Sequence, residues 1–212
     1  MEKPVIIIGL TTYTQGVIDI FESNEIVIYG ILDDRKELHG KEVREIPVLS
    51  NTTDQEYLKL LKNDCEVFVT GDENAVRSKQ IENLRKKYKR VPVNAIHQSS
   101  ILSSSCSMGH GNYIAMGATV GAGVELQSNI ILNSNVSLGI SVTIGDYSNL
   151  GQGVIVGNEC SIGSNVFIGT GAVIVPGITI GDNARIGAGS VVVEEVKENT
   201  TVYGNPAKVV EV

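Results

Sequence analysis

Residues 142–169 read VTIGDYSNLGQGVIVGNECSIGSNVFIG, and the pattern in this stretch recurs every six residues. Seventeen consecutive positions from Ile96 to Val192, spaced by six without a slip, are aliphatic or methionine. Glycine often follows such a position, and a small or aliphatic residue usually lies two positions before it. A period of six fits neither a helix nor the long alternating strands of a sandwich, but it fits a solenoid built from one short strand and one turn per face. The repeat therefore predicts a parallel β-helix.

Three hexads make one triangular coil, and strand pairing stacks successive coils at about 4.8 Å. Residues 96–192 then predict roughly five to six coils. We expect the aliphatic residue to fill the inside of each corner. We expect the glycine beside it to serve the turn, either because φ is positive there or because a Cβ has no room.

The first 95 residues follow a different pattern, in which apolar runs alternate with helix-like segments. Strands are expected at 5–9, 26–32, 65–69 and 91–96, and helices at 14–23, 54–62 and 73–87. Alternating strands and helices predict a parallel, Rossmann-like sheet. The basic run Arg85–Arg90 is interpreted as the solvated end of the last helix, where cations suit the helix dipole. The sequence thus predicts two domains, 1–95 and 96–212.

Composition excludes several classes of protein. The chain has 212 residues, 42% of them hydrophobic, and 17 Lys+Arg against 24 Asp+Glu give a net charge of −7. The hydrophobic fraction is sufficient to form a core. The negative net charge makes nucleic acid an unexpected partner. No apolar run reaches the ~20 residues that span a membrane. The three cysteines form no C-x-x-C pair, so neither disulfides nor a metal site is expected, and a reducing cytoplasm fits the chain.

The end of the chain carries a specific motif. Residues 202–208 read VYGNPAK, and they follow the repeat segment IGAGSVV at 186–192. This tail resembles the G-[NST]-P-A-K motif that ends the hexapeptide-repeat acyltransferases. The resemblance implies a left-handed parallel β-helix, association as a homotrimer, and transfer of an acyl group from coenzyme A or acyl carrier protein. The weakly charged surface of the repeat also favours a trimer.

An α/β domain of this length before the repeat narrows the resemblance. The chain resembles, over its whole length, the sialic acid O-acetyltransferases and nucleotide-amino-sugar N-acetyltransferases of the NeuD/PglD type. Leu32-Asp33-Asp34 and Ile46-Pro47-Val48-Leu49 are close to the "IDD" and "P-V-L-G" stretches of that family. The resemblance implies that the N-terminal domain binds a nucleotide sugar. It also implies that acetyl-CoA, the acyl-donor substrate, binds between neighbouring solenoids. The same resemblance implies that the enzyme works in the biosynthesis of surface glycans.

For the nucleotide, the resemblance points to Gly9, Thr11, Thr12, Asp33 and Asp34. The family's first loop is commonly G-[AG]-G-G-H-G, whereas residues 9–16 here read GLTTYTQG, so that only the first glycine is kept. The threonines still offer hydroxyls and main-chain amides, although their Cβ branches crowd the approach of a phosphate. An ordinary turn between a strand and a helix, and a capped loop around the two aspartates, are the alternative interpretations.

The family's catalytic stretch, roughly I-I-N-T-x-A-x-V-x-H-[DE]-x-x-I-G-D, aligns without gaps on residues 131–146. The usual histidine is replaced by Ile140 and the paired acid by Ser141, whereas Asn133 matches the family asparagine. Isoleucine cannot accept the proton that an attacking amine or hydroxyl loses. His110 of a neighbouring subunit is the candidate substitute, with an ordinary surface histidine as the alternative. The spacing puts His110 and Ile140 on different faces, and Asp146 two coils from His110, at about 10 Å.

For the donor, the resemblance points to Asn149, Thr170, Ala188 and Gly189 along the groove. It also points to Pro206 and Lys208 of the end motif, beside the adenine and phosphates of coenzyme A. Small residues are common in any β-helix turn, and Lys208 could be a solvated charge, so these assignments stay open.

The sequence therefore predicts a cytoplasmic, homotrimeric acetyl-CoA-dependent acetyltransferase that acts on a nucleotide-linked amino sugar or a sialic acid. A trimeric scaffold or binding protein that has kept the fold and lost the base is the alternative. A different acyl donor is a third possibility, because the groove does not distinguish acetyl from larger groups.

Overall fold

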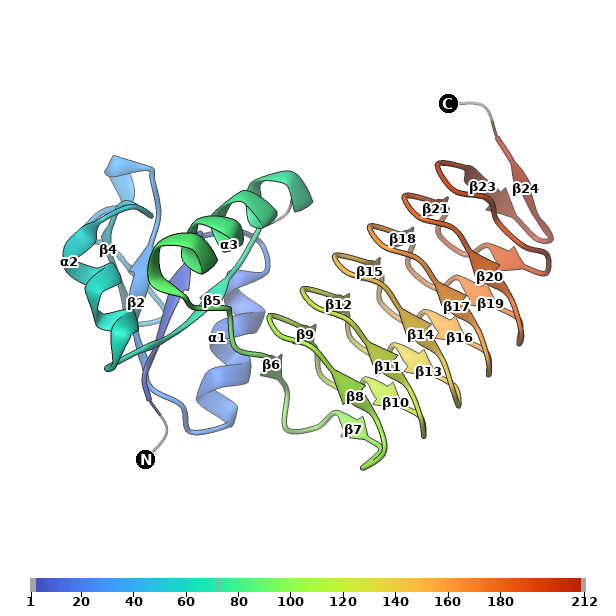
Figure 1. Cartoon of the computed structure of the whole chain (residues 1–212), viewed down its shortest axis with the longest axis horizontal. Coiled ribbons are helices and arrows are strands. Elements are labelled where there is room, and N and C mark those ends of the chain that lie inside the picture. Colours follow the sequence, from blue (N-terminus) through green and yellow to red (C-terminus); the bar gives the residue numbers. More distant parts are fainter. Residues whose placement is uncertain (1–2, 72, 211–212) are drawn as a thin grey trace. The chain divides into compact units, whose positions relative to one another are not determined.

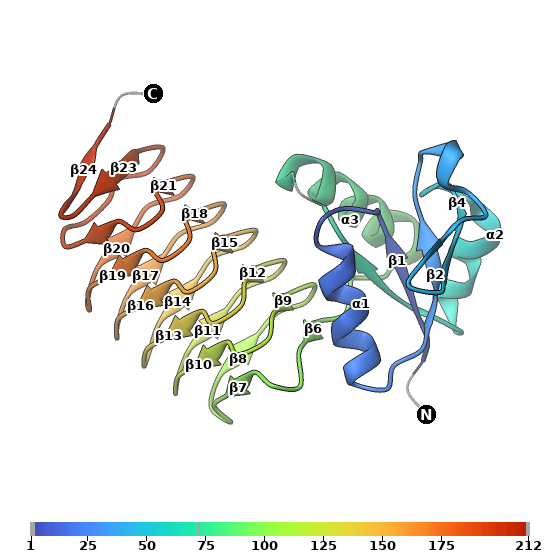
Figure 2. The same cartoon turned by 180° about the vertical axis from the view of Figure 1, so that it is seen from behind.

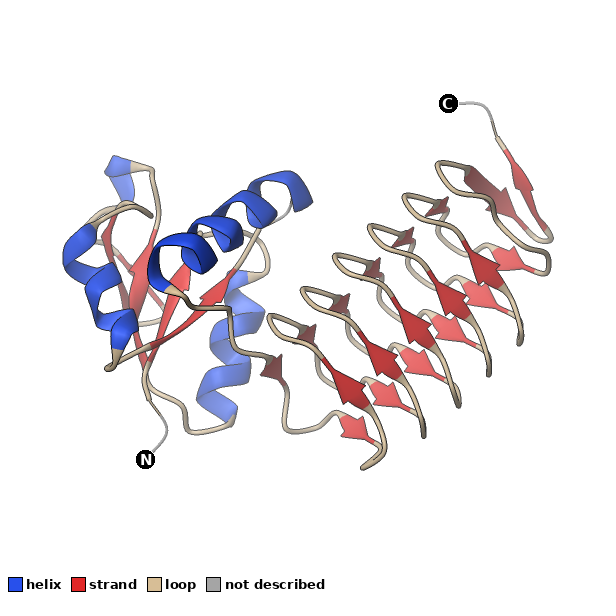
Figure 3. Cartoon of the chain, viewed as in Figure 1, coloured by secondary structure: helices blue, strands red, loops and turns tan. Residues whose placement is uncertain are grey.

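The computed structural model describes residues 3–71 and 73–210. The chain divides into two compact units, Met1–Ala95 and Ile96–Val212 (Figure 1). The first is an α/β unit and the second is built of short strands stacked in parallel sheets (Figure 3). The predicted fold class, a Rossmann-like domain followed by a hexapeptide β-helix, is confirmed.

The N-terminal unit contains a five-stranded sheet in the order β3-β4-β2-β1-β5. All neighbouring strands are parallel except the β3–β4 hairpin. The strands are β1 (Val5–Ile8), β2 (Ile28–Leu32), β3 (Glu42–Val43), β4 (Ile46–Ser50) and β5 (Glu66–Val69). Helix α1 covers one face, and α2 and α3 cover the other (Figures 1 and 2). The helical segments are α1 (Thr14–Ser23), α2 (Gln55–Leu58), α3 (Asn74–Tyr88) and two 3₁₀ turns, η1 (Lys36–Leu38) and η2 (Lys59–Lys62).

The core of this unit lies between α1 and the central strands. Ile6, Ile7 and Ile18 are completely buried, and the rings of Phe21 and Phe68 meet edge to face with centroids 6.0 Å apart. Such a pair stabilises the fold by about 0.5–1.5 kcal/mol beyond the contribution of the surface area that it buries. This packing fixes the carboxyl ends of β1, β2 and β5 relative to one another.

Two predictions about this unit need correction. The strand expected over 91–96 is reduced to β6 (Ala95–Ile96), and residues 91–94 are not in a strand. The hairpin β3–β4 has no counterpart among the predicted strands, because β3 has only two residues and β4 contains Pro47. A proline with no N–H to donate suits the hairpin at the outer end of the sheet.

The C-terminal unit stacks two-residue strands in three parallel sheets. Sheet I consists of β6, β9 (Tyr113–Ile114), β12 (Ile131–Leu132), β15 (Asn149–Leu150), β18 (Phe167–Ile168), β21 (Arg185–Ile186), β23 (Thr201–Gly204) and, antiparallel, β24 (Ala207–Val209). Sheet II consists of β7 (Ile101–Leu102), β10 (Thr119–Val120), β13 (Ser137–Leu138), β16 (Ile155–Val156), β19 (Val173–Ile174) and β22 (Val191–Val192). Sheet III consists of β8 (Ser107–Met108), β11 (Glu125–Leu126), β14 (Thr143–Ile144), β17 (Ser161–Ile162) and β20 (Thr179–Ile180).

Neighbouring strands of a sheet pair residues 18 apart, as Tyr113, Ile131 and Asn149 do in sheet I, except that β21 and β23 pair residues 16 apart. The coil length predicted from three hexads is therefore the observed one. In the two-residue strands the second residue faces the core, and the residue that precedes the strand is usually buried with it, as Ala118 and Val120 are. These two rows fill the interior from end to end.

The position of the repeat within the coil differs from the expectation. The aliphatic residue of each hexad lies in a strand and not in a corner, because the corners are made by the turn residues that follow. Positive φ occurs three positions after it, as at Gly153 (φ 68°) and Asn165 (φ 57°). The glycine directly after it is there for lack of space: a Cβ on Gly151 would lie 2.6 Å from the backbone N of Thr170 in the next coil.

Candidate functional site

An open cavity of about 580 Å³ lies at the carboxyl ends of β1, β2 and β5. Gly9, Thr11, Asp33 and Asp34 line it, as do Arg35, Thr52, Thr70 and Gln80. In open α/β sheets this edge is the usual place for ligands, and the volume is in the range of small-molecule sites. Of the five residues predicted to bind the nucleotide, only Thr12 is not among the lining residues. The structure thus brings the other four to one cavity.

The loop after β1 is held by threonine hydroxyls. Gly9 has φ 94°, and a Cβ there would lie 2.8 Å from the carbonyl oxygen of Thr70. The Thr70 hydroxyl donates to the Gly9 carbonyl at 2.5 Å, and the amide of Thr11 donates to the Thr14 hydroxyl at 2.8 Å. The hydroxyls of Thr14 and Thr70 therefore close the turn internally, and the close approach of Thr70 leaves no room for a Cβ at Gly9.

Asp33 is engaged by several donors. The amide of Leu10 donates to its Oδ2 at 2.8 Å, and the Nε of Arg35 donates to its Oδ1 at 2.8 Å. Burial alone would raise the pKa of Asp33, but the hydrogen bonds from Arg35 and Leu10 and the charge of Arg35 outweigh it and lower that pKa to about 2. Arg35 also donates to the carbonyl of Leu10, so Asp33 and Arg35 together tie the loop after β1 to the end of β2.

Asp34 is exposed, unlike its neighbour Asp33. Its Oδ1 accepts hydrogen bonds from both the amide and the hydroxyl of Thr52, each at 2.9 Å. The exposed carboxylate at the rim is therefore the better placed of the two to accept a hydrogen bond from a ligand hydroxyl.

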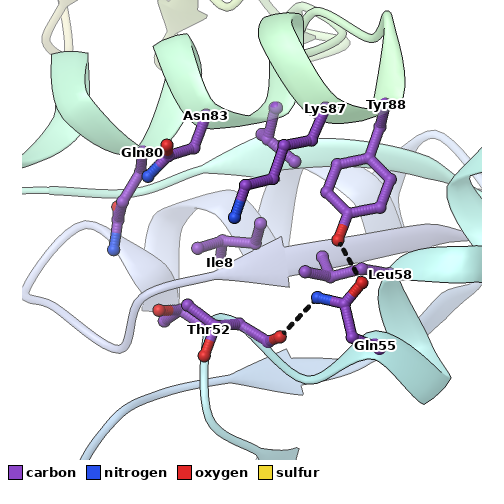
Figure 4. A pocket seen from close by; sticks show the side chains of 10 residues that line it. Ile8, Thr52, Gln55, Leu58, Gln80, Asn83, Lys87 and Tyr88 are labelled. Atoms are coloured by element: carbon purple, nitrogen blue, oxygen red, sulfur yellow. Dashed lines mark hydrogen bonds between the residues drawn. The ribbon is translucent and has the colours of Figure 1, made fainter.

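A smaller hollow of about 50 Å³ adjoins this cavity and shares Thr52 and Gln80 with it. Figure 4 shows Gln80, Asn83 and Lys87 extending from α3 toward Ile8 and the segment that carries Thr52. The hydroxyl of Tyr88 donates to Gln55 Oε1 at 3.0 Å and closes one end. Sequence reasoning missed these residues. The solvated basic run that the sequence predicted is found at the end of α3, where Lys87 is exposed. Only the 3.6-residue period of α3 could have placed Gln80, Asn83 and Lys87 on one face.

In the C-terminal unit the predicted donor residues follow one corner. The turns that connect sheet I to sheet II, which we call corner I–II, carry Thr170, Ala188 and Gly189 in successive coils, all of them exposed. Asn133 begins the same corner two coils earlier. Its Nδ2 donates to Asn149 Oδ1 at 3.1 Å and to the carbonyl of Leu150 at 2.8 Å. Asn133, Asn149 and the donor residues therefore lie along one edge of sheet I.

Ile140 lies elsewhere, in the turns from sheet II to sheet III, which we call corner II–III. Its side chain is 54% exposed, and its amide donates to Asn158 Oδ1 at 2.9 Å. Ser141 beside it has φ 57°. A large aliphatic side chain thus stands in solvent at a position where a side chain is free to point away from the solenoid.

His110 lies at the third corner, between sheets III and I, together with Ser128 and Asp146 in the next two coils. The His110 amide donates to the Ser128 hydroxyl at 3.2 Å, and the Ser128 amide donates to Asp146 Oδ1 at 2.7 Å. The carboxylate of Asp146 therefore holds a turn of the solenoid. His110 and Ile140 are on different corners within one subunit, in agreement with the spacing argument.

The end motif forms the hairpin β23–β24, in which the Asn205–Pro206 peptide is cis. The ring of Tyr203 packs over Gly187, where a Cβ would overlap it. Lys208 Nζ lies 3.7 Å from Glu194 Oε1, and both side chains are largely exposed. Pro206 and Lys208 are accessible at the end of the solenoid.

Among the described residues, no helix combines the length and apolar character needed to cross a membrane.

Comparisons with known proteins agree with this two-part architecture. Residues 4–84 match the PglD N-terminal domain, and residues 159–193 match the bacterial transferase hexapeptide (six repeats). No curated protein sequence matches the chain significantly.

Several solved structures match nearly the whole chain. A histidine-to-alanine mutant of GDP-perosamine N-acetyl transferase from Caulobacter crescentus, in complex with CoA and GDP-perosamine, is 27% identical over 99% of this chain and 97% of that chain, with a TM-score of 0.89. The acetyltransferase domain of PglB from Neisseria gonorrhoeae, in complex with acetyl coenzyme A, is 25% identical over 99% of this chain and 100% of that chain, with a TM-score of 0.90. In both of its domains the chain therefore resembles the PglD-type hexapeptide-repeat sugar N-acetyltransferases.

Proposed function

We propose that the protein transfers the acetyl group of acetyl-CoA to the amino group of a nucleotide-linked sugar. The observation that carries the proposal is the full-length similarity to an N-acetyl transferase whose structure contains CoA and GDP-perosamine. The cavity at the carboxyl edge of the N-terminal sheet supports it, because it offers a nucleotide a site of suitable size and polarity.

The transfer requires one bond to form and one to break. The amine nitrogen attacks the thioester carbonyl carbon, the C–S bond breaks, and the CoA thiolate leaves. The nitrogen loses a proton and the thiolate gains one, so the reaction balances without a metal ion. The protein must hold the two substrates in line and provide a route for the proton.

On the acceptor side, we assign the nucleotide to Gly9, Thr11, Asp33 and Asp34, which line the cavity, and no longer to Thr12, which does not. Asp34, at the rim and joined to Thr52, is assigned to the ribose hydroxyls. Asp33 acts indirectly, because its carboxylate oxygens already accept from Leu10 and Arg35. Asn133 is assigned to the acceptor sugar. Its Nδ2 donates to Asn149 and Leu150, and its amide oxygen takes no part in these two hydrogen bonds.

On the donor side, we assign the pantetheine arm to the exposed turns of corner I–II. Asn149 would hold its start, and Thr170, Ala188 and Gly189, exposed in successive coils, would line it. Small residues there let a ligand reach the backbone amides between coils. Pro206 and Lys208 at the end of the solenoid are assigned to the adenine and phosphates, with Lys208 exchanging Glu194 for a phosphate.

The proton acceptor is the open point of the mechanism. By resemblance, Ile140 replaces the family histidine, and an aliphatic group cannot take a proton. His110 of a neighbouring subunit is the proposed base, and an amine that arrives neutral would need none. The second candidate function is that of a scaffold or binding protein with the same fold and no catalytic activity. The exposed side chain of Ile140 at corner II–III favours it.

We also propose that the protein is a homotrimer. The outward-facing first residues of the sheet II strands carry no charge at any described position, whereas sheet III presents Glu125 and sheet I presents Arg185. Ile101 and Ile155 on this face are 69% and 49% exposed. An uncharged face with exposed aliphatic side chains is suited to self-association.

Calorimetry tests the proposal first. Acetyl-CoA should bind in the micromolar range, about −8 kcal/mol. UDP-, dTDP- and GDP-linked amino sugars, and free sialic acid, should then be titrated and assayed by release of the CoA thiol. A product acetylated on nitrogen supports the proposal, and acetylation of sialic acid on oxygen replaces it with the other substrate class. Binding without thiol release would favour the scaffold, and absence of any binding would refute the enzyme.

A further inference from the structure

We propose that Glu159 is the general base of the transfer and takes the role of the histidine that, by resemblance, Ile140 replaces. Glu159 lies at corner II–III, in the coil next to that of Ile140, and its side chain is exposed. This inference rests on the proposed acetyl transfer and on the proposed trimer. Within them, Glu159 replaces His110 as the proton acceptor.

The arrangement of the three corners decides which side chains can meet between subunits. The proposed trimer turns sheet II of every subunit toward a three-fold axis, so the two corners that flank sheet II meet at each junction. Corner I–II of one subunit then adjoins corner II–III of its neighbour. His110 lies at the third corner, between sheets III and I, which is on the outside of such a trimer. The junction therefore contains Glu159 and the donor turns and leaves His110 out.

Glu159 is also at the right level along the solenoid. The coil from β12 to β14 carries Asn133 and Ile140, and the next coil, from β15 to β17, carries Asn149 and Glu159. Rotation about a three-fold axis keeps every coil at its own height, and successive coils are only about 4.8 Å apart. Asn133 is assigned to the acceptor sugar and Asn149 to the start of the pantetheine arm. A neighbouring subunit's corner II–III thus presents Glu159 where the two substrates meet.

The contacts of Glu159 hold its backbone and leave its carboxylate available. Its amide donates to the carbonyl oxygen of Ile140 at 2.8 Å, which fixes the two turns against each other. Its carboxylate takes part in none of the hydrogen bonds and ion pairs formed among residues 3–71 and 73–210. Asp146 and Asp182, in contrast, each accept a hydrogen bond from a serine amide of the preceding coil. A turn carboxylate without such a structural partner is free to accept a proton from a substrate.

The backbone conformation at this position is unfavourable for glutamate. Glu159 has φ 59°. Between residues 111 and 199 every residue with positive φ is glycine or asparagine, except Ser141, Tyr147 and Glu159. A Cβ is crowded in this region, and for this reason glycine and asparagine are preferred there. Residues held in such conformations concentrate at functional sites, which supports a role for the Glu159 side chain beyond stability.

A carboxylate at this place can take up the proton that the transfer releases. When the amine nitrogen bonds to the thioester carbon, it becomes positively charged and its N–H becomes acidic. The carboxylate of Glu159 accepts that proton, the C–S bond breaks, and the CoA thiolate leaves. The proton then passes to the thiolate or to water, so Glu159 is ionised again before the next cycle.

Glu159→Asn and Glu159→Gly test this assignment, because both residues suit the positive φ and neither can accept the proton. The melting temperature should be unchanged or higher and the acetyl-CoA affinity unchanged, whereas kcat for thiol release should fall about 100-fold or more. Glu159→Asp, which keeps a carboxylate on a shorter side chain, should retain part of the rate. Added formate should restore part of the rate to Glu159→Gly.

Glu125→Gln is the matched control, since it removes an exposed carboxylate from the outer face of sheet III and should leave kcat unchanged. A wild-type kcat in Glu159→Asn would overturn the inference, as would a loss of kcat in His110→Asn but not in Glu159→Asn. Either result refutes the base and leaves the transfer standing. A wild type that binds acetyl-CoA and releases no thiol with any acceptor refutes the proposed transfer as well.

Discussion

The carboxylate of Asp33 accepts hydrogen bonds from Leu10 and Arg35, and the pKa of this group is about 2. In the unfolded chain the same carboxyl titrates near 3.8. Because the folded pKa is the lower one, Asp33 stabilises the fold fully above pH 4, and this contribution disappears as the pH falls from about 4 to about 2.

We therefore expect Asp33→Asn to reduce the acid sensitivity of the N-terminal unit. Urea unfolding at pH 5 and pH 3 should show a smaller loss of stability for the variant than for the wild type. Asp34→Asn is the matched control, since Asp34 is exposed and pairs only with Thr52 among the contacts described above. An unchanged pH dependence in Asp33→Asn would contradict the role assigned to the ion pair.

Ile140 gives a second test at the level of the single side chain. Ile140→His with Ser141→Asp should raise kcat for acetyl transfer, because a positioned general base contributes about 100-fold or more. Ser141 has φ 57°, a conformation that aspartate tolerates better than most residues, so Ser141→Asp should be accepted more readily than Ser141→Glu. Thiol release from acetyl-CoA measures the effect.

Ile140→Asn with Ser141→Asp is the control, since it adds polarity without a base. Equal rates in the two double variants would mean that a base at corner II–III does not reach the acceptor.

The turns between the short strands use glycine in two different ways, and substitution separates them. Gly151→Ala should destabilise the solenoid by about 1–3 kcal/mol, because the Cβ would lie 2.6 Å from the Thr170 backbone N in the next coil. Gly153 has φ 68° and nothing within 4 Å of its Cβ position. Gly153→Asn should therefore be nearly neutral, as Asn165 has the same conformation three residues after its own strand. Thermal unfolding of both variants checks the difference, and equal losses would contradict it.

The sequence pattern predicted helix α3 but did not reveal that one of its faces lines a hollow. The segment was predicted over 73–87 and is found at Asn74–Tyr88, so its existence and length were clear from the residues. Which of its faces covers a cavity depends on the segment after β4, which is more than 20 residues earlier in the chain. Local periodicity cannot report such a contact, although it correctly predicted Lys87 as one exposed charge of the last turn.

The uncharged outer face of sheet II leads to a prediction about assembly. Light scattering should give about three times the chain mass of 22.6 kDa. Ile155→Lys should shift the protein toward the monomer, because each buried lysine would have to lose its hydration. Ser161→Lys, at an exposed position of sheet III, should leave the mass unchanged. A trimer that persists in Ile155→Lys would exclude this face from the interface.

The hexad repeat was enough to predict the β-helix, its coil length and the rows of buried residues. The physical reason is that the strands from β7 to β22 pair with residues 18 positions away, so that one short pattern determines the contacts of every such coil. Only the last coil is shorter, with Arg185 paired to Thr201. The alternation of strands and helices in the first 95 residues similarly predicted a parallel sheet, and the ends of its strands pointed to Gly9, Asp33 and Asp34.

The chemistry of the cavity depended on contacts between distant segments. Arg35 donates to the carboxylate of Asp33, Thr52 donates to Asp34, and Gln80 reaches the cavity from α3. The two kinds of glycine in the solenoid likewise became distinct only when the next coil was in place. A residue's type and its local conformation can be inferred from its neighbours in sequence, whereas its partners and free hydrogen-bonding groups are set by side chains that folding brings together.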